Sequence, residues 1–328
     1  TDWINYVLFS PDGKYLSSSS SDRTIKIWDF ESGTEVKTIT GNSEENYALA
    51  FSPNGRYLAT GSFDKNIKLY KVLKSKVNEK SATHEKTEEP EILPAKKPKE
   101  VSAVNDMWDL ISEKKKEKVE TPVEIIPPKE KNYFSSVDVN EVFTMMHQGY
   151  ISAITFSADS KFLISGSFDK SIKIWALNNG KEVKTLTGHS GSILTMSLIP
   201  NSKTMASGST DKSIKIWSLE SGKLIKTLTG HTDPLKSISV SQDGKLLVSC
   251  SMDKNIKIWN INSGKEIQSF NGHDDIISSV KFSPDAKLIA SSSFDKTIKI
   301  WNAETAKEIK TFKGHKGNVN SVEFSSDN

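Results

Sequence analysis

The chain has 328 residues, with 44 Lys and Arg against 41 Asp and Glu, and the net charge of +3 argues against a nucleic-acid binder that relies on a strong basic field. No apolar stretch reaches the ~20 residues needed to span a bilayer, which argues against a membrane protein. The only cysteine, Cys250, excludes an internal disulfide framework and favours a reducing, cytoplasmic setting.

A set of residue types recurs along the chain with a period of 42 residues. Tryptophan closes an Ile-Lys-Ile-Trp run at Trp175, Trp217, Trp259 and Trp301. Histidine and aspartate keep the same step, at His147, His189, His231, His273 and His315, and at Asp22, Asp64, Asp169, Asp211, Asp253 and Asp295. The step from Asp64 to Asp169 is 63 residues longer than the period, so one inserted segment interrupts the repeat.

Each repeat is predicted to form four short strands. In one copy the apolar-rich runs are Ile193–Leu198, Thr204–Ser207, Ile214–Trp217 and Leu224–Leu228, and the alternation of Ile with Lys in the third run is typical of a strand. Turn sequences such as Ser10-Pro11-Asp12-Gly13 separate strands in this pattern. Because one such unit cannot bury both of its faces alone, we expect the units to stack side by side around an axis.

The Gly-His pairs at 188–189, 230–231, 272–273 and 314–315, with the downstream Ser-x-Asp and Trp, resemble WD40 repeats over nearly the whole chain apart from the insert. The resemblance implies an all-β propeller of four-stranded blades, six complete, with the first strand of a seventh at Val319–Phe324. It also implies that the first strand of each blade is innermost. The fourth-to-first and second-to-third connections then share one face, called the top face, and the other connections lie on the bottom face.

The resemblance further implies a hydrogen-bonded structural tetrad in four blades. These tetrads are His147-Ser165-Asp169-Trp175, His189-Ser207-Asp211-Trp217, His231-Ser249-Asp253-Trp259 and His273-Ser291-Asp295-Trp301. The second unit has Asn42 and Tyr70 where His and Trp belong, and the first begins after the His position but retains Ser18, Asp22 and Trp28. In the third unit Met146 replaces the glycine before the histidine. We expect these three blades to be less tightly held.

The repeat pattern assigns residues 1–73 to blades one and two in part, 74–141 to the insert, and 142–328 to the remaining blades. The insert holds six of the eleven prolines and no glycine, a composition that predicts disorder. The spacing of Val104, Met107, Trp108 and Ile111 predicts a short helix over residues 102–118. This helix would either fold onto a partner or dock on the propeller's own bottom face, and both interpretations remain open.

Large apolar residues recur at two top-face positions: directly before the repeated Asp, and three residues after the repeated His. They predict an apolar rim for a partner, formed by Trp3, Phe63, Tyr150, Phe168, Met252, Ile276 and Phe294. The residue after the Asp is a cation in every blade: Arg23, Lys65, Lys170, Lys212, Lys254 and Lys296. An apolar centre with a basic fringe suits an extended peptide with acidic or phosphorylated residues. The alternative is a solubilising surface whose aromatic residues pack on neighbouring loops.

The sequence does not predict catalysis. Five of the six histidines occupy the periodic position and the sixth, His84, lies in the insert, while no cluster has metal-ligand spacing and no Gly-rich phosphate loop is present. We therefore expect a non-enzymatic scaffold for protein or peptide partners, without cofactor or metal. Because the sequence begins with Thr1 and ends within a repeat, the alternative is a sensor or regulatory propeller of a larger multidomain signalling protein whose catalytic module lies elsewhere.

Overall fold

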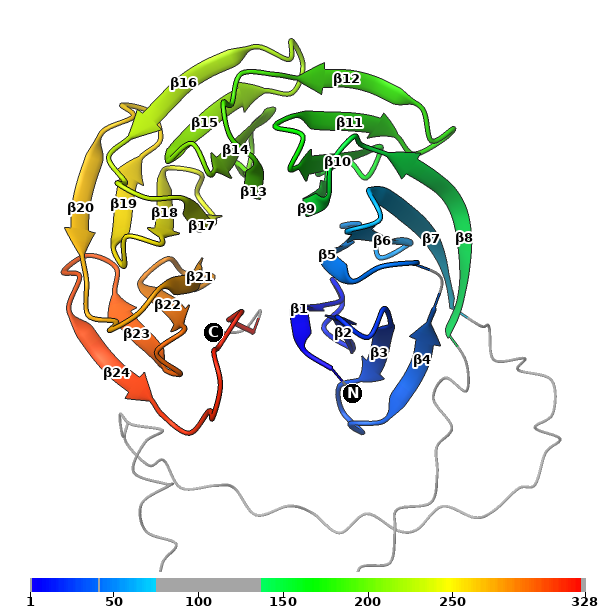
Figure 1. Ribbon diagram of the computed structural model, residues 1–328, viewed down its shortest axis with the longest axis horizontal. Helices are drawn as coiled ribbons and strands as arrows, with labels where there is room; N and C mark the ends of the chain where they lie inside the picture. The colour runs from blue at the N-terminus through cyan, green and yellow to red at the C-terminus, as the bar shows by residue number, and fades with distance from the viewer. Residues whose placement is uncertain (1, 41, 75–136, 326–328) are drawn as a thin grey trace, which may run out of the picture. The chain divides into compact units, whose positions relative to one another are not determined.

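The computed structural model describes residues 2–40, 42–74 and 137–325, where every regular element is a β-strand. The strands form six four-stranded sheets in which consecutive strands are neighbours. The sheets stand as six blades around a common centre, with the first strand of each blade innermost and the fourth outermost (Figure 1). The predicted all-β propeller with six complete blades is confirmed.

The strands of the first three blades have these bounds. Blade one comprises β1 (Ile4–Phe9), β2 (Tyr15–Ser20), β3 (Ile25–Asp29) and β4 (Glu35–Ile39). Blade two comprises β5 (Asn46–Phe51), β6 (Tyr57–Ser62), β7 (Asn66–Lys74) and β8 (Val137–Met146). Blade three comprises β9 (Ile151–Phe156), β10 (Phe162–Ser167), β11 (Ile172–Ala176) and β12 (Glu182–Leu186).

The other three blades repeat the same plan, and all ladders within blades are antiparallel. Blade four comprises β13 (Ile193–Leu198), β14 (Thr204–Ser209), β15 (Ser213–Ser218) and β16 (Leu224–Thr229). Blade five comprises β17 (Leu235–Val240), β18 (Leu246–Ser251), β19 (Ile256–Asn260) and β20 (Glu266–Phe270). Blade six comprises β21 (Ile277–Phe282), β22 (Leu288–Ser293), β23 (Ile298–Asn302) and β24 (Glu308–Phe312).

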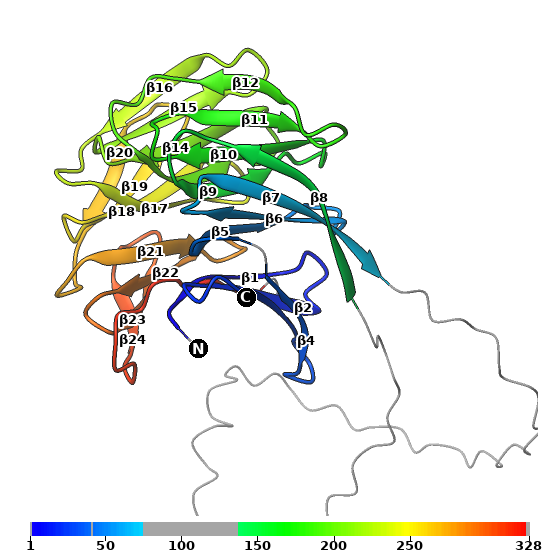
Figure 2. The same cartoon turned by 45° about the vertical axis from the view of Figure 1, so that its right-hand side comes forward.

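The insert is shorter than predicted, because β7 and β8 continue as a ladder beyond the repeat. Their pairing extends to Lys74 opposite Val137, so residue 74 and residues 137–141 belong to strands. Val72 and Val139 pair in this extension and pack against the core between blades one and two. Figure 2 shows β7 and β8 running together past the other strands of their sheet. The rest of the insert, including the predicted helix at 102–118, lies outside the described residues.

The hydrophobic core consists of layers between neighbouring blades. Ile67 and Leu69 of blade two, for example, cluster with Ile151 and Trp175 of blade three, and comparable clusters join the other neighbours from blade one to blade six. These layers require a small residue on the second strand. A Cβ atom added to Gly166 would lie 2.6 Å from Ile193 Cγ2 in the next blade. Each blade is therefore stabilised by its neighbours.

The first strand of a seventh blade, predicted at Val319–Phe324, does not form, since residues 317–325 have no strand assignment. Val319 is buried, its N–H donates to Ser293 O at 3.1 Å, and Lys281 pairs with Glu323 at 2.8 Å, so the segment lies against blade six. A first strand pairs with the second strand of its own blade, as β21 does with β22.

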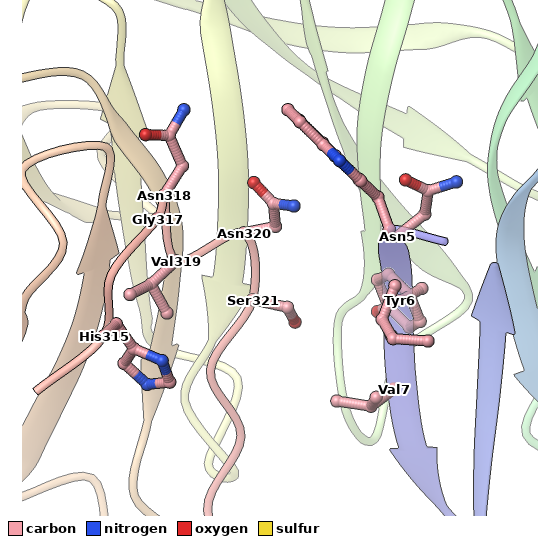
Figure 3. Close-up of a pocket in the computed structure, with 11 residues that line it drawn as sticks. Asn5, Tyr6, Val7, His315, Gly317, Asn318, Val319, Asn320 and Ser321 are labelled. Carbon is pink, nitrogen blue, oxygen red and sulfur yellow. The ribbon is translucent and has the colours of Figure 1, made fainter. Parts of the chain in front are cut away.

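A cavity of about 650 Å³ separates this segment from blade one. Figure 3 shows its two walls, with the stretch from His315 to Ser321 on one side and Asn5, Tyr6 and Val7 of β1 on the other. The tight inter-blade packing seen elsewhere is therefore missing here.

Buried polar atoms without a hydrogen-bond partner concentrate in blades one and two. Among the described residues they belong to Ser17, Ser19, Asn42, Asn46 and Tyr70. Three of these residues depart from the repeat: Asn42 stands for His, Tyr70 for Trp, and Ser17 for the alanine of Ala59, Ala206 and Ala290. Because each orphaned group loses its hydration without compensation, these two blades are the least favourably packed.

We predict opposite effects for two neighbouring serines of β2. Ser17→Ala should raise the free energy of unfolding by about 1 kcal/mol, because it removes a buried hydroxyl that has no partner. Ser18→Ala should lower it by a similar amount, about 1 kcal/mol, because the Ser18 hydroxyl accepts the Trp28 indole N–H at 3.2 Å. Urea unfolding followed by tryptophan fluorescence measures both, and equal signs for the two variants would refute this account of blade one.

Candidate functional site

Two sets of connections lie together on the top face of the ring. In blade three the N–H of Phe168, in the turn between β10 and β11, donates to Tyr150 O in the loop before β9, at 2.9 Å. The same bond joins Thr210 to Ser192 in blade four, also at 2.9 Å. The predicted pairing of these connections is therefore observed, and the loop and turn of one blade form a single surface.

Blade four shows how a tetrad is built. The Trp217 indole N–H donates to Ser207 Oγ at 2.8 Å, and His189 Nε2 lies 2.8 Å from the same oxygen. His189 Nδ1 lies 2.7 Å from Asp211 Oδ2. Since an indole can only donate, the Ser207 hydroxyl proton is free to point at Nε2, and the imidazole proton then resides on Nδ1 and points at the aspartate. The histidine is thus satisfied as a neutral ring.

The other three predicted tetrads have the same geometry. Across all four, the Nδ1–Oδ2 distances are 2.7–2.9 Å, the Nε2–Oγ distances 2.7–2.8 Å, and the indole-to-Oγ distances 2.7–2.8 Å. The members are His147, Ser165, Asp169 and Trp175; His231, Ser249, Asp253 and Trp259; and His273, Ser291, Asp295 and Trp301. In each blade the aspartate also accepts a backbone N–H from the top loop, so the tetrad ties loop, turn and sheet together.

Blade two, which lacks the histidine and the tryptophan, has an incomplete network, whereas blade three keeps a complete tetrad although Met146 precedes its histidine. In blade two Asn42 Nδ2 donates to Thr60 Oγ1 at 3.3 Å, while Ser43 donates its N–H and hydroxyl to Asp64. The Tyr70 hydroxyl is buried without a partner among the described residues. His315 keeps the periodic position but is exposed, whereas the four tetrad histidines are at most 7% exposed.

The family model described as "WD domain, G-beta repeat" matches seven segments of the chain: residues 1–29, 33–71, 140–176, 180–218, 222–260, 264–302 and 306–328. The chain belongs to the WD40 repeat family. The last matched segment contains the stretch that forms no strand, so sequence similarity to a WD40 repeat extends beyond the sixth complete blade.

Curated relatives share about one repeat's length with this WD40 chain. The general transcriptional corepressor TUP1 of Saccharomyces cerevisiae is 43% identical over 47 residues, 14% of this chain and 7% of that protein. The nuclear distribution protein nudF of Emericella nidulans is 48% identical over 44 residues, 13% of this chain and 10% of that protein. Ribosome assembly protein 4 of Saccharomyces cerevisiae is 49% identical over 35 residues, 11% of this chain and 7% of that protein. The matches thus span a tenth or less of each relative.

In each tetrad a serine contacts a histidine, which in turn contacts an aspartate, as in the catalytic triad of a hydrolase. The burial and hydrogen bonds of the serine nevertheless suit a structural role. The four tetrad serines are completely buried, and each Oγ already accepts an indole N–H. A nucleophilic serine must instead reach a substrate carbonyl. Cys250 is also completely buried, and burial raises the pKa of its thiol. In the described ranges, no three His, Cys, Asp or Glu side chains gather as a metal site requires.

The electrostatics favour neutral histidine in three tetrads and ionised aspartate in all four. Burial lowers the pKa of His147, His189 and His273, against the opposing effect of the aspartate that each contacts. Burial of Asp211 opposes its ionisation, but hydrogen bonds from Ser213 and His189 outweigh burial and lower its pKa to about 2. The pKa values of Asp169, Asp253 and Asp295 are likewise lowered to about 2, with burial again outweighed by hydrogen bonds.

Part of the predicted apolar rim forms a continuous strip of aromatic rings. Tyr47 stacks on Phe63 with ring centroids 5.3 Å apart, Phe63 lies 4.9 Å from Tyr150, and Tyr150 lies 5.8 Å from Phe168. We call these four residues the aromatic strip; it crosses the top of blades two and three. Tyr47 was not predicted, because it belongs to the first strand of its blade and not to either position chosen from the repeat.

The other four predicted rim residues make no ring contact with the aromatic strip, although two of them share a central cavity with Tyr47. Trp3, 68% exposed, and half-buried Phe294 line a central cavity of about 330 Å³, to which the first strands of all six blades contribute. Met252 is exposed on blade five and Ile276 half-buried on blade six. The aromatic strip is thus the place where side chains of the predicted rim contact one another from blade to blade.

The six predicted cations are all exposed, and all adopt a left-handed backbone, with φ between 65° and 72°. The residues are Arg23, Lys65, Lys170, Lys212, Lys254 and Lys296. Glycine adopts this conformation without steric cost, whereas a side chain is strained there. Turn geometry alone therefore does not select a cation at this position.

The structure offers no helix in residues 2–40, 42–74 and 137–325 that could cross a membrane.

We predict that the tetrad histidines stabilise the fold whereas the exposed one does not. His189→Ala should lower the free energy of unfolding by about 1–3 kcal/mol, because the buried Ser207 hydroxyl loses the acceptor of its proton and Asp211 loses one of its hydrogen-bond donors. His315→Ala, the matched control at the same repeat position, should change it by less than about 0.5 kcal/mol. Urea unfolding measures the free energy of unfolding of both variants. A similar loss of stability in the two would contradict a special role for the tetrad histidines.

We predict that the fold loses stability below about pH 6.5, the usual pKa of histidine. The lowered pKa of His147, His189 and His273 means that the unfolded chain binds protons that the folded chain does not. Their contribution is therefore complete above the unfolded pKa and is lost as pH falls through the folded values. Urea midpoints at pH 8, 7, 6 and 5 test this, with a weaker pH dependence expected for His189→Asn. A constant or rising midpoint on acidification would contradict the prediction.

Proposed function

We propose that this WD40 propeller is a non-catalytic scaffold that binds a protein or peptide partner on its top face, with the aromatic strip as the anchor. One observation carries the proposal: four aromatic rings in unbroken contact cross two blades, and Tyr47, Tyr150 and Phe168 are 36%, 43% and 39% exposed. Exposed apolar patches of this kind mark interaction sites, and aromatic residues dominate their binding energy.

The hydrogen bonds that fix the backbone of the aromatic strip support the same function. Tyr150 and Phe168 are joined through their backbones at 2.9 Å, and the adjacent Asp169 is fixed by His147 and by the N–H of Gln148. A partner would meet side chains on an already ordered backbone, so little conformational entropy is lost on binding. Loops held by a rigid scaffold commonly carry binding function.

The alternative hypothesis, a sensor or regulatory propeller of a larger multidomain signalling protein, would use the same face. No contact among the described residues favours it over the scaffold. We propose the cytoplasm as the setting, supported by the single free thiol of Cys250. Nucleic acid is a poor partner candidate because the cations of the top face are interspersed with carboxylates such as Asp233 and Asp275.

We predict that Tyr150→Ala combined with Phe168→Ala abolishes partner binding without unfolding the protein. Peptides selected from a phage-displayed random library on the full chain should bind the double variant at least about tenfold more weakly, since exposed aromatic anchors supply most of the binding energy. Fluorescence anisotropy of the labelled peptides measures the affinity, and circular dichroism checks the fold.

Val183→Ala with Ile267→Ala is the matched control, because these apolar residues are 51% and 54% exposed on outer strands. This control should bind the peptides like the wild type. Equal losses in both double variants, or unfolding caused by the Tyr150 and Phe168 changes, would overturn the proposed function.

A further inference from the structure

The top loops of the six blades differ in charge at one repeat position, two residues after the place of the tetrad histidine. Blades one, two, five and six carry a carboxylate there: Asp2, Glu44, Asp233 and Asp275. Blades three and four have Gly149 and Gly191 instead. A Cβ atom at either glycine would lie 2.6 Å from the backbone N of the tetrad aspartate, so these two loops have no room for a side chain.

The cations of blades three and four consequently lack an acidic neighbour on their own top loop. Lys170 and Lys212 are exposed, whereas Gln148, Tyr150, Ser190 and Ser192 around the two glycines are uncharged. The nearby tetrad aspartates are already engaged: each accepts from its histidine and from a backbone N–H of the loop. Neither lysine forms an ion pair with a described carboxylate, and the same holds for Lys254 and Lys296 of blades five and six.

The aromatic strip adjoins Lys170, whose turn contacts the uncharged top loops of blades three and four. Phe168, the last ring of the strip, directly precedes Asp169 and Lys170 in the turn of blade three. Ser192 Oγ of blade four donates to Phe168 O at 3.2 Å, which joins the strip to the top loop of blade four. A ligand that packs on Tyr150 and Phe168 therefore reaches the two lysines without crossing an acidic loop.

We infer, building on the proposed function, that the partner is an extended peptide with a carboxylate beside the apolar residue that packs on the aromatic strip. Lys170 and Lys212 bind this carboxylate, which takes the place of the acidic side chain that blades three and four lack. We choose a carboxylate because it is the group that the top loops of the other four blades carry at this repeat position; lysine itself can bind either a carboxylate or a phosphate. The strip provides affinity, and the lysines provide charge selectivity.

Selection of phage-displayed random peptides on the full chain tests the inference. Enriched peptides should carry Asp or Glu within a few positions of a large apolar residue, and binding should weaken as NaCl is raised. Lys170→Gln with Lys212→Gln should weaken binding of an enriched peptide by about tenfold, the effect of losing a charge-assisted contact. The matched control is Lys254→Gln with Lys296→Gln, on blades whose top loops carry Asp233 and Asp275, and it should change binding less than about twofold.

The outcomes separate this inference from the proposed function. Peptides that need Tyr150 and Phe168 but show no acidic enrichment, or that respond equally to both lysine pairs, overturn the inference and leave the scaffold function standing. Enrichment of phosphorylated over acidic versions of the same peptide overturns the choice of carboxylate. Failure to enrich any peptide that depends on the strip overturns both.

Discussion

The close approach of one blade's second strand to the next blade's first strand sets the spacing of blades two to six. Gly61, Gly166 and Gly208 leave room for Ile151, Ile193 and Leu235, and an added Cβ would lie within 3.3 Å of those side chains. Cys250 occupies the same repeat position, where its thiol contacts Ile277 O at 3.4 Å. Because each sheet buries its face only against a neighbour, the blades are held by one another rather than by a single central core.

The tetrads connect the packed sheets to the loops and turns of the top face through hydrogen bonds. Each one begins at a tryptophan within the sheet, passes through a buried serine and histidine, and ends at an aspartate that accepts N–H groups from the top loop and turn. The loops are therefore fixed by groups whose loss would orphan several buried polar atoms. The variable top-face residues are displayed on this fixed backbone, which allows one fold to present different chemistry in different blades.

The sequence predicted most of the fold, because a residue type that recurs every 42 positions recurs in the same environment. The blade count, the strands of blade four and the pairing of top loops with turns follow from that spacing. The extension of β7 and β8 was not predictable from the repeat, since it depends on strand pairing outside the repeat. The contact of Tyr47 with Phe63 was missed for a related reason: it joins two different repeat positions, and only three-dimensional packing brings them together.

Departures from the repeat differ in their effect on stability, depending on whether they lie in the buried network or on the top loops. Ser17, Asn42 and Tyr70 change the buried network, and in the described part of the chain the polar atoms left without partners all belong to blades one and two. Gly149 and Gly191 change only the charge of the top loops, while the tetrads of their blades stay complete. The aromatic strip joins two blades that differ in this respect. Phe63 belongs to blade two, which has buried polar atoms without partners, and Phe168 belongs to blade three, which has a complete tetrad. If a partner contacts both rings, as proposed, it selects the state in which the two blades are packed together, and its binding free energy then adds to the stability of blade two through mass action.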